Sequence, residues 1–274
     1  MKKFNVASCQ MNVVDDKETN IEHAKKLINE ASEKADLITL PEMFNTPYSN
    51  EKFIENAEKE KNSYSLKTMC EVAKENNVYL QAGSIAELEK EKIYNTAYLI
   101  DNNGNIIAKH RKMHMFDINT ETMKFRESDT LSPGNKITSI ETPLANISIA
   151  ICYDIRFSQM WTLMNNNNTD LFLLPGAFNK TTGPLHWETL IRARAIDNQA
   201  YIIATSPSQV ENPYYIAWGH SMIVDPWGKV LSKAEKKEEI LYATIEPESV
   251  KSVREQIPIL KNRRKDVYET IYKK

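Results

Sequence analysis

Residues 147–157, with the sequence ISIAICYDIRF, constrain the fold of this chain more than any other stretch. The alternating isoleucines indicate a buried β-strand, and the strand ends at Cys152. We expect Asp154 to cap a following helix, which would place the Cys152 sulfur on a strained, exposed turn near the positive end of the helix dipole. Such a position favours the thiolate, the nucleophilic form of cysteine. The alternative role for Cys152 is that of most free cysteines, a small buried hydrophobic residue.

The rest of the chain predicts strands and helices in alternation, with several hairpins. Short apolar runs indicate strands at 4–10, 36–40, 78–82, 93–100, 106–108, 137–140, 147–151, 170–174, 201–204, 214–224, 230–231 and 240–245. Helical spacing of apolar residues indicates helices at 18–32, 63–76, 157–164 and 187–199. Together these elements predict a mixed-sheet α/β fold with helices on the outside. The polar stretch 109–135 has the length of a functional loop.

Composition is that of an ordinary globular protein. The 274 residues are 41% hydrophobic and 26% charged, with a formal net charge of -2, and no apolar run approaches the ~20 residues of a membrane span. No linker-like stretch interrupts the pattern, so we expect one domain over 1–274. The basic run 261–265 lacks interleaved aromatic residues, and we expect no nucleic-acid or membrane partner. Three distant cysteines and the lack of a signal-peptide core fit a reducing cytoplasm.

Two further residues follow strands in the way that Cys152 does. Glu42 comes after the strand that ends at residue 40, and Lys112 lies just past the strand near 106–108. Because ligand sites form at the carboxyl ends of strands in such sheets, the three groups are expected to meet at one rim. A carboxylate can take a thiol proton, a thiolate can attack a carbonyl carbon, and an ammonium can stabilise the oxyanion. Taken singly, a glutamate after a strand is usually a solvated loop residue, and a lysine in a basic run usually belongs to a solvated face.

These residues carry a resemblance that extends nearly end to end. The segments LPE at 40–42, RKMH at 111–114 and ICYDIRF at 151–157 resemble the Glu, Lys and Cys signatures of the nitrilase superfamily of carbon–nitrogen hydrolases. Three separated signatures in the right order are far more specific than any one of them. Further segments resemble the ω-amidase branch of that superfamily: EMFNTPY at 42–48, FDI at 116–118, FRES at 125–128, LSPG at 131–134, LPGAFN at 174–179, TTGPLHWE at 181–188, RARA at 192–195, WGHS at 218–221 and DPWG at 225–228.

The resemblance implies a four-layer αββα sandwich with the active site between the sheets. It implies that Glu42 is the general base, Lys112 the oxyanion stabiliser and Cys152 the nucleophile. A second glutamate, Glu127, would hold Lys112 in place, and the backbone N–H of Tyr153 would be the second oxyanion donor. The implied reaction is hydrolysis of a linear amide through a cysteine thioester, with no cofactor.

The branch implies short 2-oxo dicarboxylic acid monoamides as substrates, such as 2-oxoglutaramate and 2-oxosuccinamate. Their distal carboxylate needs a cation, for which Arg156 is the candidate, although a structural ion pair with a buried acid suits this arginine equally well. Tyr48, Phe116 and Thr182 would shape the pocket, and the loop 116–127 is a candidate lid. Alternatives within the superfamily are an amidase for deaminated glutathione, another aliphatic amidase, a carbamoyl-amine hydrolase and a nitrilase. An inactive scaffold is disfavoured because all four catalytic positions hold competent residues.

Other features have less specific explanations. His110 and His114 are spaced like helical zinc ligands, but no cluster supplies further ligands, so we expect no metal. By analogy with the superfamily, the helix 187–199 and the C-terminal segment 250–274 are expected to pack at a homodimer interface. We expect hydrogen bonds in the core or at the interface for His186 and His220, and structural packing for Cys9 and Cys70.

Overall fold

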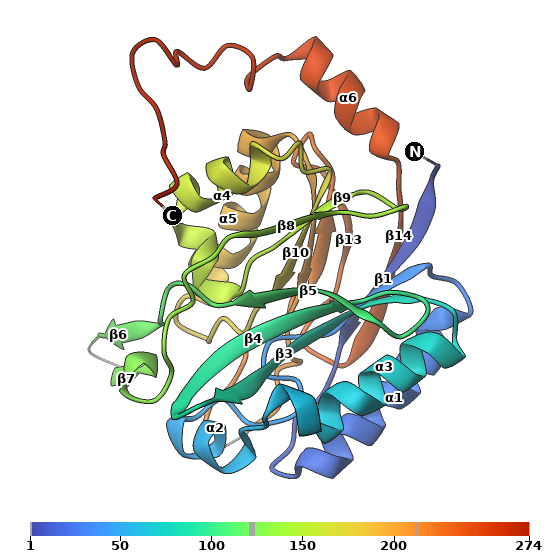
Figure 1. The fold of residues 1–274 in the computed structure, drawn as a ribbon, viewed down its shortest axis with the longest axis vertical. Helices are drawn as coiled ribbons and strands as arrows, with labels where there is room; N and C mark the ends of the chain where they lie inside the picture. The colour runs from blue at the N-terminus through green and yellow to red at the C-terminus, as the bar shows by residue number, and fades with distance from the viewer. Residues whose placement is uncertain (1, 121–123, 212, 274) are drawn as a thin grey trace.

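The computed structural model describes residues 2–120, 124–211 and 213–273, which form two six-stranded β-sheets packed face to face with helices on both outer faces (Figure 1). In the first sheet the order is β14 (Glu239–Ile245), β1 (Phe4–Gln10), β2 (Leu37–Thr39), β3 (Tyr79–Glu89), β4 (Lys92–Ile100) and β5 (Ile106–Arg111). In the second it is β13 (Val230–Lys233), β12 (Met222–Val224), β11 (Tyr201–Thr205), β10 (Leu171–Pro175), β9 (Asn146–Ile149) and β8 (Thr138–Glu141).

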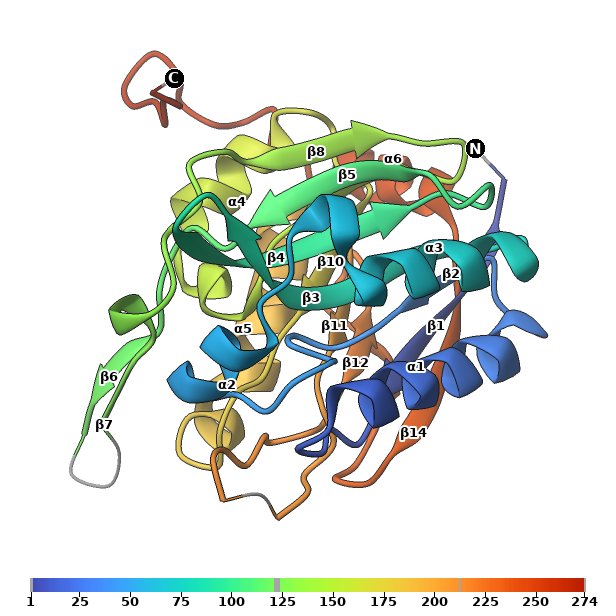
Figure 2. The ribbon, with the colours of Figure 1, turned by 60° about the horizontal axis from the view of Figure 1, so that its bottom comes forward.

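Helical crossovers make the centre of each sheet parallel. In the first sheet, α1 (Lys17–Ser32) connects β1 to β2, while α2 (Asn50–Asn56) and α3 (Tyr64–Glu75) lie between β2 and β3. In the second, α4 (Ser158–Asn165) and α5 (Gly183–Asn198) connect β9 to β10 and β10 to β11. Figures 1 and 2 show α1 and α3 together on one outer face and α4 and α5 together on the other. This arrangement confirms the predicted αββα sandwich.

Local sequence explains where the helices on the first sheet begin and which face they bury. Asp16 caps α1 by accepting a hydrogen bond from the Thr19 N–H, and Ser63 caps α3 in the same way. The apolar residues of α1 recur at helical spacing and are all buried: Ile21, Ala24, Leu27, Ile28 and Ala31. Burial of this apolar stripe against the sheet is the main source of the helix's stability.

The sheets also contact each other through polar groups at their inner faces. The hydroxyl of Thr205 on β11 lies 2.7 Å from the hydroxyls of both Ser8 on β1 and Thr39 on β2. All three side chains are buried. Their hydroxyl groups form hydrogen bonds with one another, which the surrounding apolar side chains could not provide. The hydroxyls therefore fix how the second sheet lies on the first.

The structure differs from the prediction in several regions, among them α2, which the sequence did not indicate. Residues 214–221 do not continue a strand: β12 covers only Met222–Val224, because Gly219 and His220 both adopt positive φ angles of 76° and 56°. The predicted long loop contains a ribbon, β6 (Asp117–Asn119) paired with β7 (Lys124–Arg126), which projects from the body of the molecule (Figure 2). At the other end of the chain, α6 spans Pro247–Gln256, and residues 257–273 form an extended arm (Figure 1).

Candidate active site

Loops after three strands bring Glu42, Lys112 and Cys152 together. Glu42 follows β2, Lys112 is the first residue after β5, and Cys152 begins the 3₁₀ helix Cys152–Arg156 after β9. The carboxylate and the ammonium therefore come from the first sheet, and the thiol comes from the second. All three side chains are buried. The expected convergence at the ends of strands is present.

Lys112 is the centre of a buried network of hydrogen bonds. Its Nζ donates to Glu42 Oε1 at 2.9 Å, to Glu127 Oε1 at 2.9 Å and to the hydroxyl of Tyr48 at 3.0 Å. Burial alone would lower the pKa of Lys112, but the carboxylates of Glu127 and Glu42 outweigh it and hold the pKa well above its ordinary range. The ammonium is therefore charged in the resting protein.

One carboxylate oxygen of Glu42 accepts hydrogen bonds, and the other has no hydrogen-bond partner among the described residues. Oε1 accepts hydrogen bonds from Lys112 and, at 2.8 Å, from Asn95 Nδ2. Oε2 has no partner of regular hydrogen-bond geometry among the residues that the structure describes. Burial raises the pKa of Glu42 above its ordinary 4.5. The Lys112 ammonium and the nearby Cys152 thiol act in the opposite direction, but burial outweighs them. Glu42 thus combines a raised pKa with a carboxylate oxygen that has a lone pair available.

Cys152 is held in a strained backbone conformation, with a positive φ of 44°. The backbone N–H of Ala177 donates to its Sγ at 3.5 Å. Burial, followed by the negative charge of Glu42, raises the pKa of the thiol well above 9.0. The expectation of an exposed turn is therefore wrong, because Cys152 is buried, and burial favours the thiol over the expected thiolate.

Asp154 does not cap α4, the role that the sequence suggested, because α4 begins only at Ser158; its side chain instead completes a capping box at the start of the 3₁₀ helix Cys152–Arg156. Its buried carboxylate joins the two catalytic loops. On the cysteine turn it accepts from the N–H of Ile151 at 3.1 Å, and on the lysine loop it accepts from His110 Nε2 at 3.2 Å and His114 Nδ1 at 2.7 Å. The backbone N–H of His114 donates to it as well. Hydrogen bonds from the two histidines outweigh burial and lower the pKa of Asp154, so the carboxylate is charged.

A cavity of about 10 Å³ opens beside the thiol and is called the Cys152 chamber below. Four residues singled out from the sequence line it with Cys152: Phe116, Tyr153, Arg156 and Thr182. Tyr48 does not line it. Its hydroxyl donates to Glu127 Oε1 at 2.9 Å and receives a hydrogen bond from Lys112, so Tyr48 contacts the buried network around the lysine.

Arg156 has no carboxylate partner within ion-pair distance among the described residues. Its Nη2 lies 3.2 Å from His186 Nδ1, and its buried Nε has no hydrogen-bond partner in the described part of the chain. The guanidinium lies over the rings of Tyr153 and Phe178. Of the two roles considered from the sequence, a structural ion pair with a buried acid is therefore excluded within this part of the chain.

Some residues of the site were not singled out from the sequence. Asn95 and Tyr215 contact the site from a strand and a loop of ordinary local pattern. Ala177 lies in the segment LPGAFN, which carries the resemblance, but only three-dimensional proximity identifies its contact with Cys152. His220 was expected to form side-chain hydrogen bonds, but neither ring nitrogen has a partner among the described residues; the ring packs on Trp218. Cys9 is packed in the core as expected, and Cys70 is half-buried.

Two other kinds of feature are absent from the described residues. No group of three or more His, Cys, Asp or Glu side chains in that part of the chain is arranged to hold a metal ion. No helix there is long and apolar enough to cross a membrane.

Residues 5–255 match the family model of the carbon-nitrogen hydrolases. The chain belongs to this family. Among solved structures, the carbon-nitrogen hydrolase fold here is similar to Nit3 of Saccharomyces cerevisiae, a member of branch 10 of the nitrilase superfamily, with a TM-score of 0.89 and 38% sequence identity over 96% of this chain and 97% of that one. It is also similar to the NitFhit protein of C. elegans, with a TM-score of 0.90 and 31% identity over 98% of this chain and 66% of that one.

Curated relatives within the family match over the whole chain. The omega-amidase NIT2 of Xenopus tropicalis is 45% identical over 276 aligned residues, which cover 100% of both proteins. The omega-amidase NIT2 of Homo sapiens is 41% identical, again with 100% of both covered. The superfamily resemblance and the sandwich fold inferred from the sequence are thereby confirmed.

Proposed function

We propose that this carbon-nitrogen hydrolase is an ω-amidase, which converts short 2-oxo dicarboxylic acid monoamides into the dicarboxylate and ammonia. The observation that carries the chemistry is the buried convergence of Glu42, Lys112 and Cys152, with the lysine 2.9 Å from the glutamate. The observation that carries the substrate class is identity of 41–45% to omega-amidases over the full length of the chain.

Acylation begins with proton transfer from the Cys152 thiol to the open Oε2 of Glu42. Because burial raises the pKa of both groups, the thiol is not ionised beforehand, and transfer accompanies attack of Sγ on the amide carbon. Negative charge develops on the carbonyl oxygen, where the Lys112 ammonium and the Tyr153 backbone N–H stabilise it. A preorganised charge in a water-excluded site is usually the largest contribution to such catalysis.

Ammonia leaves when Glu42 returns its proton to the amide nitrogen and the C–N bond breaks. The remaining thioester on Cys152 is attacked by water, and Glu42 takes one proton of that water. The C–S bond then breaks, the proton returns to the sulfur, and the dicarboxylate is released. Glu127 keeps Lys112 charged and in place throughout, through its 2.9 Å hydrogen bond.

Arg156 is the proposed binding group for the distal carboxylate of the substrate. It lines the same chamber as Cys152, and its unpartnered Nε leaves a donor for a ligand. A guanidinium binds a carboxylate through two parallel N–H donors, which fixes orientation as well as affinity. Phe116 and Thr182 form the adjacent walls. The three unpaired cysteines support a further proposal, that the protein works in the reducing cytoplasm.

The test is ammonia release by purified protein from 2-oxoglutaramate, succinamate, deaminated glutathione and a simple nitrile, measured in parallel. We expect turnover of the first two and loss of at least 10³-fold in Cys152→Ala, since the covalent route is removed. Cys70→Ala is the matched control, because this half-buried cysteine lies outside the site, and it should retain wild-type rates.

Other outcomes separate the alternatives. Activity confined to deaminated glutathione would support the proposed mechanism but show that the proposed substrate is wrong. Hydrolysis of the nitrile alone would show that the protein is a nitrilase. Turnover by a clean preparation of Cys152→Ala would refute the thioester mechanism itself.

A further inference from the structure

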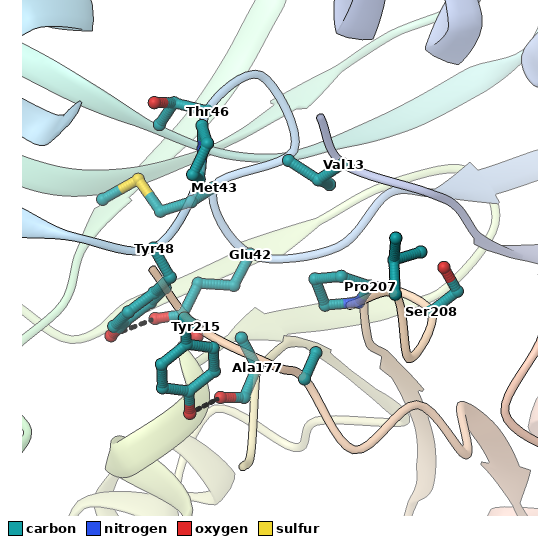
Figure 3. A pocket seen from close by; sticks show the side chains of 12 residues that line it. Val13, Glu42, Met43, Thr46, Tyr48, Ala177, Pro207, Ser208 and Tyr215 are labelled. Atoms are coloured by element: carbon teal, nitrogen blue, oxygen red, sulfur yellow. Dashed lines mark hydrogen bonds between the residues drawn. The ribbon is translucent and has the colours of Figure 1, made fainter. Parts of the chain in front are cut away.

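Arg156 is the one lysine or arginine that lines the cavities of the site, among the described residues. It lines the Cys152 chamber, and the neighbouring cavity around Glu42, which Figure 3 shows, has no such side chain in its described walls. Lys112 lies close by, but acceptors within the buried network take its three donors. Recognition of a substrate carboxylate therefore depends on how one guanidinium is held.

The walls of the Cys152 chamber do not fix this guanidinium. It lies 5.5 Å from the ring centroid of Tyr153 and 5.1 Å from that of Phe178, and both rings line the chamber. The chamber has a volume of about 10 Å³, room for about one water molecule, so a dicarboxylic acid monoamide binds only when the chamber widens. Stacking on rings that move with the walls leaves the guanidinium free to turn. Arg156 therefore needs an anchor outside the chamber.

His186 provides this anchor, and it does not line the chamber. Its Nδ1 lies 3.2 Å from Arg156 Nη2, which is the one hydrogen bond of the guanidinium within the described part of the chain. A guanidinium has no acceptor, so Nδ1 accepts the bond and the imidazole is neutral, with its proton on Nε2. The buried Nε of Arg156 has no partner among the described residues and is left for a ligand.

The start of α5 holds His186 in place. The His186 backbone N–H donates to the Thr182 carbonyl at 2.9 Å, and the N–H of Thr182 donates to Asn179 Oδ1 at 2.8 Å. The next residue, Trp187, is buried, and its Nε1 donates to the His220 carbonyl at 2.7 Å. The imidazole is therefore carried by a firmly bonded helix end.

His186 is neutral at pH 7. Burial, followed by the positive charge of Arg156 on the facing 3₁₀ helix, lowers the pKa of His186 below its ordinary 6.5. No other charged group among the described residues shifts this pKa; Glu188, on the same helix, is paired with Lys233 and Arg192. Below the lowered pKa, Nδ1 gains a proton and presents an N–H to the N–H groups of Arg156, so the hydrogen bond is lost.

We propose that His186 is a positioning residue for substrate recognition, which holds the Arg156 guanidinium in the orientation that binds the distal carboxylate of the substrate. This inference rests on the proposed function, in which Arg156 binds that carboxylate. No bond to His186 changes during the reaction. Its effect therefore falls on KM for anionic amides, and kcat stays the same.

The experiment compares KM for 2-oxoglutaramate with KM for an uncharged short amide, from about pH 8 to about pH 5. The 2-oxo carboxylate stays ionised throughout this range. Titration of Glu42 or of the histidines that bind Asp154 affects both substrates, so the ratio of the two KM values removes it. In wild type we expect KM for 2-oxoglutaramate to rise about fivefold as pH falls, with no such rise for the uncharged amide.

Two variants separate the hydrogen bond from the charge. His186→Asn keeps an acceptor near the position of Nδ1 but does not titrate, so its KM for 2-oxoglutaramate should match wild type at pH 8 and stay level on acidification. His186→Leu has no acceptor, so its KM should be about fivefold higher at every pH, with kcat unchanged. His23→Leu is the matched control and should behave as wild type, because His23 lies on α1, outside both cavities, and binds Glu238.

The direction of the pH effect decides the outcome. A histidinium that acted only as a positive charge would attract the anion, so a wild-type KM that falls at low pH overturns the proposal. A wild-type KM in His186→Leu, an equal rise for both substrates, or a His186→Asn variant no better than His186→Leu also overturns it. Failure of the proposed function looks different: wild type would release no ammonia from 2-oxoglutaramate, or Arg156→Lys would leave its KM unchanged, and both proposals would then be wrong.

Discussion

At the scale of single residues, Lys112 has no spare donor in the resting protein. An ammonium carries three N–H groups, and those of Lys112 are taken by Glu42, Glu127 and Tyr48. An oxyanion can therefore bind only when one of these acceptors weakens. Glu42 does so when it takes the thiol proton, because a neutral carboxyl accepts more weakly than a carboxylate. Proton transfer and oxyanion stabilisation are thus expected to be coupled through this one lysine.

The pH dependence of kcat/KM should report the tuned Glu42. Its pKa is raised above 4.5, and only the ionised form accepts the thiol proton, so activity is lost as pH falls through that raised pKa. We expect the midpoint of the acid limb above 4.5. The rate should stay level to beyond pH 9, because the pKa of Lys112 is raised as well. The assay should use an uncharged amide, so that the substrate itself does not titrate. An acid midpoint below 4.5 would contradict a raised pKa of Glu42.

Arg156→Lys tests the binding of the distal carboxylate. The variant keeps the charge but loses the paired donors, so we expect KM for carboxylate-bearing amides to rise about tenfold, which corresponds to ~1.4 kcal/mol. The kcat should change little, because Arg156 does not contact the reacting atoms. An uncharged short amide serves as the control substrate. An equal rise in KM for both substrates would show that Arg156 shapes the chamber rather than binding the carboxylate.

The candidate site divides into residues that local sequence predicts and residues that it does not. Glu42, Lys112 and Cys152 follow strands within short motifs, so pattern and resemblance predicted their meeting. Asp154 was assigned to a helix cap, because a carboxylate just after a strand usually has that role. Its actual partners on the lysine loop are about 40 residues away in sequence, and no local pattern predicts such a contact.

At the scale of elements, Glu87 on β3 binds β5, the strand that ends one residue before Lys112. Its carboxylate binds Arg111 through two hydrogen bonds of 2.7 Å, and it also binds Lys109, both on β5. Thr96 on the intervening β4 donates to it as well. Burial would raise the pKa of Glu87, but these partners outweigh it and lower the pKa to about 2. One carboxylate therefore connects three adjacent strands.

Glu87→Gln should lower the free energy of unfolding by about 3 kcal/mol at pH 7, the value expected for a pKa shift of this size and for breaking a buried pair. Because the folded pKa is depressed, the stabilisation is present above the unfolded pKa and is lost as pH falls toward 2. The difference between wild type and variant, followed by urea unfolding, should shrink between pH 4.5 and 2.

Glu89→Gln is the matched control for this change. Glu89 also binds Arg111, at 3.0 Å, but its side chain is half exposed, and exposed ion pairs contribute less than about 1 kcal/mol. A loss in Glu89→Gln as large as that in Glu87→Gln would mean that the charge balance of Arg111, rather than the buried link between strands, sets the stability.

The elements themselves were largely predictable, with one informative exception. Strands such as β10 contain unbroken apolar runs and are buried on both faces, which made them visible in the sequence. The stretch 214–221 has similar apolar content but follows an irregular path. Its shape depends on left-handed conformations at Gly219 and His220 and on contacts with distant loops, and periodicity gives no indication of either.

At the scale of the whole molecule, we propose a homodimer. Large apolar side chains remain exposed on α5 and on the C-terminal arm, among them Leu185, Val267 and Ile271. Unpartnered apolar surface of this kind is typical of an interface between subunits. Within the domain proposed for 1–274, Val250 and Val253 of α6 pack into the core, and the exposed remainder of the segment 250–274 would serve association.

Light scattering tests the dimer directly. We expect a mass of twice the 31.5 kDa of one chain, and a shift toward one chain mass in Leu185→Asp, which places a charge within the proposed interface. Tyr64→Asp is the control, because Tyr64 is also exposed but lies on α3, on the opposite outer layer. A wild-type mass of 31.5 kDa would refute the proposal.

The hydroxyl link between Ser8, Thr39 and Thr205 has a consequence for how function depends on folding. It fixes the offset of one sheet on the other, and the base and the nucleophile are carried by different sheets. Neither half of the sandwich contains a catalytic unit, so activity depends on the alignment of two separate layers. A displacement of one sheet by about 1 Å relative to the other would leave every helix and strand intact and would still abolish most of the activity. Circular dichroism would then report a native protein, and loss of turnover would be the first sign of the displacement.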